Sequence, residues 1–202
     1  RTLEQYIGQK HLVGEGAVLH QMVASGQISS IILWGPPGVG KTTLAKIIAN
    51  QLERPFYVLS AINSGVKDVR EAIEKAKKSR FFNSAPPILF IDEIHRFSKS
   101  QQDSLLGAEE EGTVSLVGAT TENPSFEVIS PLLSRCQVYV LEPLTREDLM
   151  VLYHRIMKED VVFKNRRVEL KEEDALLRFS GGDARKVLNI IELVANAFQE
   201  GE

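Results

Sequence analysis

The chain has 202 residues, of which 43% are apolar and 25% charged, and its formal net charge is −3 at pH 7. This length allows one large domain and a small one, and the composition is that of an ordinary globular protein. The negative net charge excludes an overall basic surface, so any DNA contact must come from a local patch. Cys136 is the only cysteine, which excludes an internal disulfide and favours a reducing compartment. Because no apolar run approaches a membrane span and no signal peptide is present, we expect no membrane association.

The first 30 residues precede the first predicted core strand. Within them, Leu3, Tyr6, Ile7 and the turn at Gly8 lie where an adenine ring could pack. Such a segment can equally do no more than cover the core, and from these residues alone we favour that interpretation.

Residues 35–42, with the sequence Gly-Pro-Pro-Gly-Val-Gly-Lys-Thr, match the phosphate-binding loop pattern G-x-x-x-x-G-K-[ST]. The apolar run at 31–34 predicts a buried strand before this P-loop, and the apolar spacing over 44–52 predicts a helix after it. The alternative, a glycine-rich turn that binds nothing, does not need this strand–loop–helix context. The glycines let backbone N–H groups converge on phosphate oxygens at the start of the helix.

Two side chains of the P-loop have predicted roles of their own. Lys41 is expected to reach the β and γ phosphates of ATP, and Thr42 to offer its hydroxyl to Mg²⁺. The nucleotide-binding residues of this segment are predicted to be Pro37, Gly38, Val39, Gly40, Lys41, Thr42 and Thr43.

A strand over 56–59 and a helix over 66–81 are predicted next. The helix has a buried stripe at the spacing i, i+3, i+4, i+7, formed by Val69, Ala72, Ile73 and Ala76. Its outer face is rich in lysine and arginine interspersed with acids, which would suit a DNA-facing patch. A solvated helix face has the same pattern, and we favour that interpretation.

The apolar run Ile88–Ile91 ends in Asp92 and Glu93. It predicts a buried strand with two carboxylates at its carboxyl end, where ligands bind in open parallel sheets. Asp92 is expected to hold Mg²⁺ through water, and Glu93 to orient and deprotonate the attacking water. Two exposed acids at a strand end are the alternative. Their position in the sequence, about fifty residues after the P-loop, favours the catalytic interpretation.

A helix is expected over 101–111, with Leu105 and Leu106 directed inward. Glu109 falls on or near the same buried face. A carboxylate there must be paired, extended to solvent or protonated, or the helix must end differently. The sequence offers no explanation of this residue.

A strand over 114–119 is followed by polar residues at 120–124, which could contact a γ-phosphate or the attacking water. Turn chemistry ahead of a proline favours the same residue types. Ser130 and Pro131 are predicted as the N-cap and first residue of a short helix that leads to Arg135. A fifth strand over 137–141 completes a pattern of strands separated by helices, which indicates a parallel α/β sheet.

Residues 141–143 form the predicted domain boundary, because the pattern beyond them is helical only. The capping box Thr145-x-x-Asp148 opens one helix, a second spans 170–179, and Asp183 caps a third that runs to about residue 199. Arg185 and Lys186 stand in the first turn of this third helix, where the helix dipole favours anions. Two cations there make sense if a phosphate binds, whereas a tolerated surface arginine is the alternative.

The predicted fold class is therefore α/β, with a five-stranded parallel sheet sandwiched by helices and followed by a small all-helical lid. We expect residues 1–142 to form the large ATPase domain and residues 143–202 to form the lid.

This combination of P-loop, Asp-Glu strand, polar strand end, arginine after a short helix and lid with Gly-Asp-Ala-Arg resembles the AAA+ ATPases over essentially the whole chain. The more specific segments are 92–97, 99–103, 118–126 and 133–136. Together they resemble the replication-associated recombination protein A family, whose eukaryotic relatives are called Werner-helicase-interacting protein. That family is related to clamp-loader subunits and to the RuvB branch-migration motor.

The resemblance implies roles for individual residues. Thr121 matches sensor 1, Arg185 matches sensor 2, and Arg135 matches the arginine finger that reaches the nucleotide of a neighbouring subunit. Ile7 and Gly8 match the adenine-side segment. ATP and Mg²⁺ are the implied cofactors.

The resemblance also implies partners and a location. The full-length form is expected to be a homo-oligomer that binds DNA at forks and single-strand/duplex junctions, with single-strand-binding protein and the replication machinery as partners. The implied location is the cytoplasm, in association with the nucleoid, in a bacterium and the nucleus in a eukaryote.

Two features depart from the family pattern. The C-terminal oligomerisation region of the family would follow Glu202 and is absent, and the sequence begins at Arg1 rather than Met. We therefore expect a fragment that can be monomeric. Glu109 stands where relatives generally have an apolar residue, which leaves the packing of its helix open.

The leading functional prediction is a DNA-stimulated, Mg-ATP-dependent ATPase of replication-fork maintenance and recombination, hydrolysing ATP at subunit interfaces. A clamp-loader subunit or a branch-migration motor would use the same site in another assembly. A nucleotide-gated scaffold with little turnover is the alternative from a different class, although a pure binder needs neither Glu93 nor Arg135.

Overall fold

The computed structural model describes residues 2–80, 85–159 and 173–197. The chain divides into two compact units. The first unit comprises Arg1–Tyr6, Lys10–Gly35 and Lys41–Leu141, and the second comprises Ile7–Gln9, Pro36–Gly40 and Glu142–Glu202. The P-loop therefore begins and ends in the first unit, while its central turn belongs to the second.

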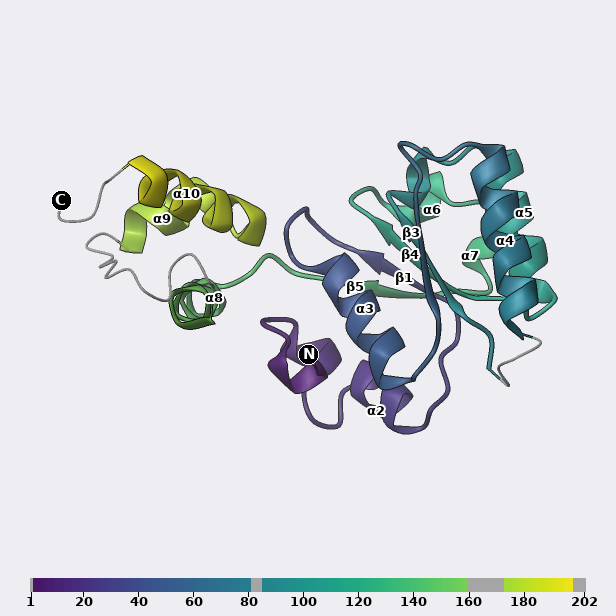
Figure 1. Cartoon of the computed structure of the whole chain (residues 1–202), viewed down its shortest axis with the longest axis horizontal. Coiled ribbons are helices and arrows are strands. Elements are labelled where there is room, and N and C mark those ends of the chain that lie inside the picture. Colours follow the sequence, from purple (N-terminus) through teal and green to yellow (C-terminus); the bar gives the residue numbers. More distant parts are fainter. Residues whose placement is uncertain (1, 81–84, 160–172, 198–202) are drawn as a thin grey trace. The chain divides into compact units, whose positions relative to one another are not determined.

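A parallel sheet of five strands forms the centre of the first unit (Figure 1). Its strands in chain order are β1 (Ile31–Trp34), β2 (Phe56–Ser60), β3 (Ile88–Asp92), β4 (Ser115–Thr120) and β5 (Gln137–Val140). They lie side by side in the order β2-β3-β4-β1-β5. The middle strands consist mostly of apolar residues, because both faces of such a sheet are covered. This arrangement confirms the predicted fold class.

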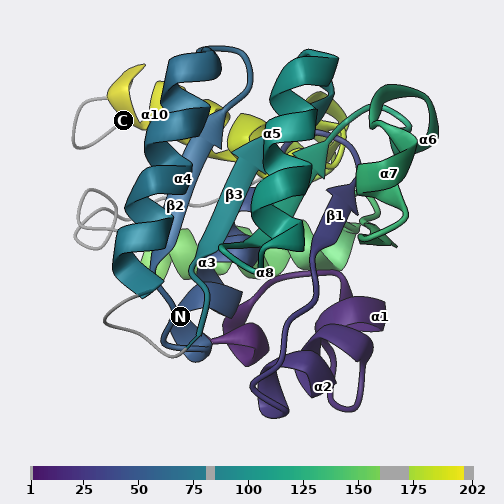
Figure 2. The same ribbon diagram turned by 90° about the vertical axis from the view of Figure 1, so that its right-hand side faces the viewer.

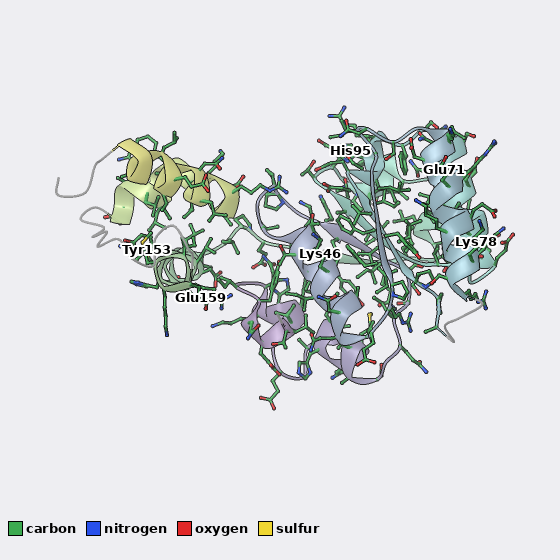
Figure 3. The ribbon with its side chains drawn as sticks, in the orientation of Figure 1. Lys46, Glu71, Lys78, His95, Tyr153 and Glu159 are labelled. Atoms are coloured by element: carbon green, nitrogen blue, oxygen red, sulfur yellow. The ribbon has the colours of Figure 1, made fainter. Side chains whose placement is uncertain are left out.

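Helices cover both faces of the sheet (Figure 2). Helix α3 (Lys41–Gln51) lies on one face, and α4 (Val66–Arg80) and α5 (Lys99–Glu110) lie on the other. Val69 and Ala76 of α4 and Leu105 of α5 are buried against the sheet, as their helical spacing predicted. Glu71 and Lys78 point outward from α4 (Figure 3), which fits the solvated face that we favoured.

The N-terminal segment forms η1 (Leu3–Gln5), α1 (Lys10–Val13) and α2 (Val18–Ala24). Leu3 is buried, and its backbone N–H donates to the Gln51 side chain at the end of α3 (3.0 Å). This part of the segment therefore covers the core, as expected from the residues alone.

Three short helices complete the first unit: η2 (Ile94–Arg96), α6 (Pro124–Glu127) and α7 (Ser130–Leu133). The prediction of Ser130 as a helix N-cap was wrong, because the N-cap is Ile129 and Ser130 is the first helical residue. The physical reason lies outside the local sequence. The buried side chain of Gln102 accepts a hydrogen bond from the Ile129 N–H (2.9 Å) and fixes the chain one residue earlier.

The lid part of the second unit contains α8 (Arg146–Glu159), α9 (Glu173–Ser180) and α10 (Ala184–Ala197). The predicted capping box is confirmed, since Thr145 N donates to Asp148 Oδ2 (3.0 Å) and Asp148 N donates to Thr145 Oγ1 (3.2 Å). Residues 170–172 of the second predicted helix and residues 198 and 199 of the third lie outside the described residues. In the described residues, these helices and the preceding Leu144 share a core that includes Leu144, Leu149, Tyr153, Ile156, Leu176, Val187 and Ile191.

None of the helices in the described parts of the chain is long and apolar enough to cross a membrane.

Candidate nucleotide site

The carboxyl ends of three strands meet at one edge of the sheet. Trp34 of β1 pairs with Thr120 of β4, and the N–H of Gly35 donates to the Thr120 carbonyl (3.1 Å). Asp92 ends β3 in register with Ser60 of β2. The start of the P-loop, Asp92 with Glu93, and the segment from Thr120 to Thr121 therefore emerge from the same edge, where α/β sheets bind ligands.

Lys41 is the first residue of α3 and is 7% exposed. A buried ammonium group needs polar partners, and Nζ donates to the Gly35 carbonyl (2.7 Å). Because Thr42 and Thr43 follow in the first turn of the same helix, their N–H groups belong to the positive end of its dipole. The arrangement suits a polyphosphate, whose oxygens would accept the Lys41 N–H hydrogen bonds in place of the Gly35 carbonyl.

The central turn of the P-loop contacts the N-terminus of α10 within the second unit. Gly38 has a φ of 74°, and its carbonyl accepts a hydrogen bond from Ala184 N (3.0 Å). A Cβ atom at Gly38 would overlap the carboxylate of Asp183. Only glycine therefore fits at this position, for both its backbone conformation and its close approach to Asp183.

Asp183 caps α10, as the sequence predicted. Its Oδ1 accepts from the backbone N–H groups of Arg185 (2.8 Å) and Lys186 (3.3 Å). This carboxylate offsets part of the repulsion between the two cations and the helix dipole. The exposed Arg185 side chain thus follows directly after a residue whose N–H bonds the P-loop.

Gly8 and its neighbours are tied to the chain that leaves the sheet. Gln9 Nε2 donates to the Glu142 carbonyl (2.7 Å), and its Oε1 accepts from Glu142 N (2.9 Å). Gly8 has a φ of 80°, and a Cβ atom there would lie 2.7 Å from Leu144 Cδ2. The segment that contains Ile7 and Gly8 is therefore closely packed on the start of the lid sequence. The sequence analysis did not identify Gln9 as the residue that holds this segment to the backbone of Glu142.

Glu93 adopts the left-handed backbone conformation (φ 53°, ψ 48°), which non-glycine residues seldom occupy. Its Oε2 accepts a hydrogen bond from Thr121 Oγ1 (3.3 Å) and lies 3.2 Å from His95 Nδ1. The structure therefore brings together the predicted water-activating residue and the predicted sensor 1 residue. It adds His95, which is 7% exposed and which sequence reasoning quoted only as part of a motif (Figure 3).

The hydrogen bonds around His95 identify which of its ring nitrogens carries a proton. Nδ1 lies 2.9 Å from Thr120 Oγ1, and the hydroxyl of Thr120 donates to the Glu122 carbonyl (3.1 Å). A carboxylate can only accept, so the contact of Nδ1 with Glu93 assigns the ring hydrogen to Nδ1.

Arg135 lies near the amino ends of the strands, at the end of the sheet opposite the carboxyl ends from which the P-loop starts. It precedes β5, whose first residue, Gln137, donates its N–H to the carbonyl of Ser30 just before β1 (3.0 Å). Strands of four residues span about 13 Å, so the length of β1 separates this edge from the one that carries the P-loop and Asp92.

Arg135 could also be a structural residue that pairs with an acid, for which the sequence suggested Glu122 or Glu142. The structure pairs it with other acids, because Arg135 Nε donates to Glu109 Oε2 (2.5 Å). Nη1 lies 3.5 Å from Glu110 Oε1. The hydrogen bond to Glu109 raises the pKa of Arg135 above its already high ordinary value. Glu109, which the sequence left unexplained, is therefore the paired carboxylate of its helix face.

Comparisons with known proteins agree with this architecture. Residues 31–144 match the model of the ATPase family associated with various cellular activities (AAA). The chain therefore belongs to the AAA family of ATPases, which confirms the predicted enzyme class.

Its whole length is also similar to replication-associated recombination protein A of Haemophilus influenzae, with 47% identity over 100% of this chain and 46% of that protein. The ATPase WRNIP1 of Dictyostelium discoideum is 44% identical over 98% of this chain and 23% of that protein. These relatives confirm the family resemblance inferred from the motifs.

Among solved structures, the Holliday junction branch migration motor RuvB of Thermotoga maritima superposes with a TM-score of 0.73 and 29% identity, over 95% of this chain and 63% of that one. The chain spans less than half the length of the curated bacterial relative described above.

Proposed function

We propose that this chain binds Mg²⁺-ATP at the P-loop and hydrolyses it by in-line attack of water, in an oligomer whose sites are completed by neighbouring subunits. Lys41 binds the β and γ phosphates, Glu93 activates water and Thr121 holds Glu93. We further propose that Arg185 contacts the γ-phosphate, and that Ile7 and Gly8 contact the adenine. The domain limits 1–142 and 143–202 belong to the same proposal.

Thr42 and Asp92 are the residues that would hold Mg²⁺. Thr42 lies in the first turn of α3 and Asp92 ends β3 at the edge from which the P-loop starts. Hydroxyl and carboxylate oxygens are the donors that Mg²⁺ prefers. When bound, the ion supplies neutralisation of charge on the phosphate oxygens. Most of the remaining catalysis is positioning and charge stabilisation by the side chains named above.

The observation that carries the proposal is the place of Arg135. Its guanidinium lies at the sheet edge opposite its own P-loop, so it cannot serve the nucleotide of its own subunit. A planar fork of N–H donors suits a phosphate at close range. An arginine supplied by a neighbour typically contributes about 10³ to 10⁵ in turnover.

The test mixes two inactive variants of the full-length protein. Arg135→Ala subunits keep an intact P-loop but donate no finger, and Lys41→Ala subunits donate a finger but bind no ATP. We expect each variant alone to lose most turnover, Arg135→Ala to keep nearly normal ATP affinity, and co-assembled oligomers to regain activity. Mixed oligomers that form and stay as inactive as the separate variants would overturn the proposal.

We also propose that the whole protein is a DNA-stimulated ATPase of replication-fork maintenance and recombination, because the relatives named above are replication-associated recombination proteins. Its proposed partners are fork and junction DNA, single-strand-binding protein and the replication machinery. The corresponding locations are the bacterial nucleoid or the eukaryotic nucleus. Steady-state ATPase of the full-length protein with and without fork DNA tests this proposal. Turnover that stays very low both with and without DNA would favour a nucleotide-gated scaffold.

A branch-migration motor is the second candidate, favoured by the similarity to RuvB. A clamp-loader subunit would share the same site. Stimulation by four-way junctions over forks would favour the motor, and dependence on a sliding clamp would favour the loader.

A further inference from the structure

Glu109, near the end of α5, has both carboxylate oxygens engaged. Oε1 accepts from Ser30 Oγ (3.3 Å), and Oε2 accepts from Arg135 Nε (2.5 Å). Its side chain is 17% exposed, whereas that of the adjacent Glu110 is 51% exposed. Glu109 therefore joins Arg135 to the inside of the unit, while Glu110 lies at the surface.

Ser30 anchors this carboxylate to the sheet. It is buried, its hydroxyl accepts a hydrogen bond from Leu116 N (3.1 Å), and its carbonyl accepts one from Gln137 N (3.0 Å). Leu116 belongs to β4 and Gln137 to β5, and Ser30 itself precedes β1. Hydrogen bonds from β4 to its hydroxyl and from β5 to its carbonyl thus hold the residue that orients Glu109.

The guanidinium of Arg135 is hydrogen-bonded through Nε, and its Nη1 makes only a longer ion pair with Glu110. Within the described ranges, the N–H groups of Nη2 have no hydrogen-bond partner, and Nη1 approaches Glu110 at 3.5 Å without a hydrogen bond. The side chain is 42% exposed. Its Nε is therefore fixed, Nη2 stays available, and Nη1 is shared only with the exposed carboxylate of Glu110.

We propose that Glu109 is a positioning residue, which holds Arg135 through Nε so that the outer nitrogens can bind a phosphate on the neighbouring subunit. This inference rests on the proposed function, in which Arg135 acts on the adjacent site. A long side chain that is oriented before the neighbour docks loses less conformational freedom when the reaction begins. The position of the Arg135 guanidinium then depends on a series of hydrogen bonds that runs from the sheet through Ser30 and Glu109.

The opposite role for the same contact is a block, in which Glu109 neutralises Arg135 and withholds it from the neighbour. The two roles predict opposite changes in turnover when Glu109 is replaced. Loss of a positioning residue lowers turnover, whereas loss of a block raises it.

The test uses full-length Glu109→Leu and Glu109→Gln, with Glu110→Gln as the matched control. Since misplacement of a catalytic group by about 1 Å costs up to about 10²-fold, we expect Glu109→Leu to lower kcat by about 10- to 100-fold. The KM for ATP should stay close to that of the parent. Glu109→Gln should regain most activity, because an amide oxygen can still accept from Arg135 Nε. Glu110→Gln removes only an exposed ion pair with Nη1 and should stay within a few-fold of the parent.

Two further measurements separate positioning from damage to the fold. Glu109→Leu mixed with Lys41→Ala should regain activity, because Lys41→Ala subunits donate an intact finger. Adding Glu109→Leu to Arg135→Ala should cause no further loss, because the first residue acts through the second.

Three outcomes overturn the inference: a kcat of Glu109→Leu equal to or above that of the parent, no recovery in the mixture, or a loss in Glu110→Gln as large as in Glu109→Leu. If the proposed function itself were wrong, Arg135→Ala would keep its turnover. That result distinguishes a failure of the proposed function from a failure of this inference.

Discussion

Glu93 combines a strained backbone with a well-held side chain. The left-handed conformation costs a residue with a Cβ about 1 kcal/mol or more, and it turns the chain sharply between β3 and η2. The carboxylate thereby reaches both Thr121 and His95. Local strain at this position is compensated by the hydrogen bonds and packing of the surrounding edge of the sheet.

Glu93→Gln is expected to bind Mg²⁺-ATP with near-parent affinity and to lose nearly all turnover. The amide keeps the shape of the side chain and can still accept from Thr121, but it cannot take a proton from water. Calorimetric affinity together with steady-state ATPase of the assembled protein measures both effects. Turnover within a few-fold of the parent would show that another residue activates water.

Cys136 is expected to be inert toward thiol reagents in the folded protein. Burial, and then the nearby charge of Glu109, raise the pKa of this thiol to about 12, although Arg135 opposes the shift. At pH 8 the thiolate fraction falls from about one quarter to about 10⁻⁴. Labelling with an aromatic disulfide reagent should be slow in buffer, fast in denaturant, and should still rise with pH above pH 9. Rapid labelling of the native chain at pH 8 would contradict this expectation.

Helix α5 is joined to the segment between β4 and β5 by one buried amide. Gln102 Nε2 donates to the carbonyls of Phe97 (3.1 Å) and Glu127 (3.1 Å), and its Oε1 accepts from Ile129 N (2.9 Å). The same helix ends at Glu109 and Glu110, and the segment fixed by Gln102 leads to Arg135. Gln102 thus binds the N-cap residue of α7.

Gln102→Leu is expected to lower the free energy of unfolding by about 2–4 kcal/mol, because buried backbone groups lose their partners while the side-chain volume is kept. Urea denaturation of the chain measures the change. Asp103→Asn, at the next and exposed position of α5, is the control and should leave the midpoint nearly unchanged. A Gln102→Leu midpoint equal to that of the parent would mean that these hydrogen bonds contribute nothing net.

The N-terminus of α10 offers a different prediction. Arg185 follows the residue that bonds the Gly38 carbonyl, and we propose that it contacts the γ-phosphate, which ADP lacks. Arg185→Ala should therefore reduce the ratio of ATP to ADP affinity by about tenfold, the size of one charged hydrogen bond. Calorimetric titration with both nucleotides gives the ratio. An unchanged ratio would remove Arg185 from the nucleotide site.

For the whole chain, the separation of Arg135 from its own P-loop has a kinetic consequence. The 202-residue chain should be a poor ATPase when dilute, and its turnover per molecule should rise with concentration as subunits meet. Steady-state rates measured beside sedimentation of the same samples test this dependence. A fast rate that is independent of concentration, from chains shown to be monomeric, would contradict it.

The features that the amino-acid pattern predicted are those formed by neighbours along the chain. The P-loop, the strand that ends in Asp92, the capping box at Thr145 and the N-cap at Asp183 each depend on a few consecutive residues with their own backbone preferences. Buried parallel strands appear as apolar runs for the same reason. The five-stranded fold could therefore be inferred before any contact between distant residues was known.

Contacts between distant residues could not be inferred in this way, because they depend on strand order and register. Ser30 and Glu109 are 79 positions apart, and Glu109 and Arg135 are 26 apart, yet one carboxylate contacts both partners. The contact of His95 with Thr120 depends on the pairing of β3 with β4. The start of α7 depends on an amide from α5. A polar residue on a buried helix face, as at Glu109, signals that a partner exists, but the partner is chosen by the packing of β1, β4 and β5 beside α5.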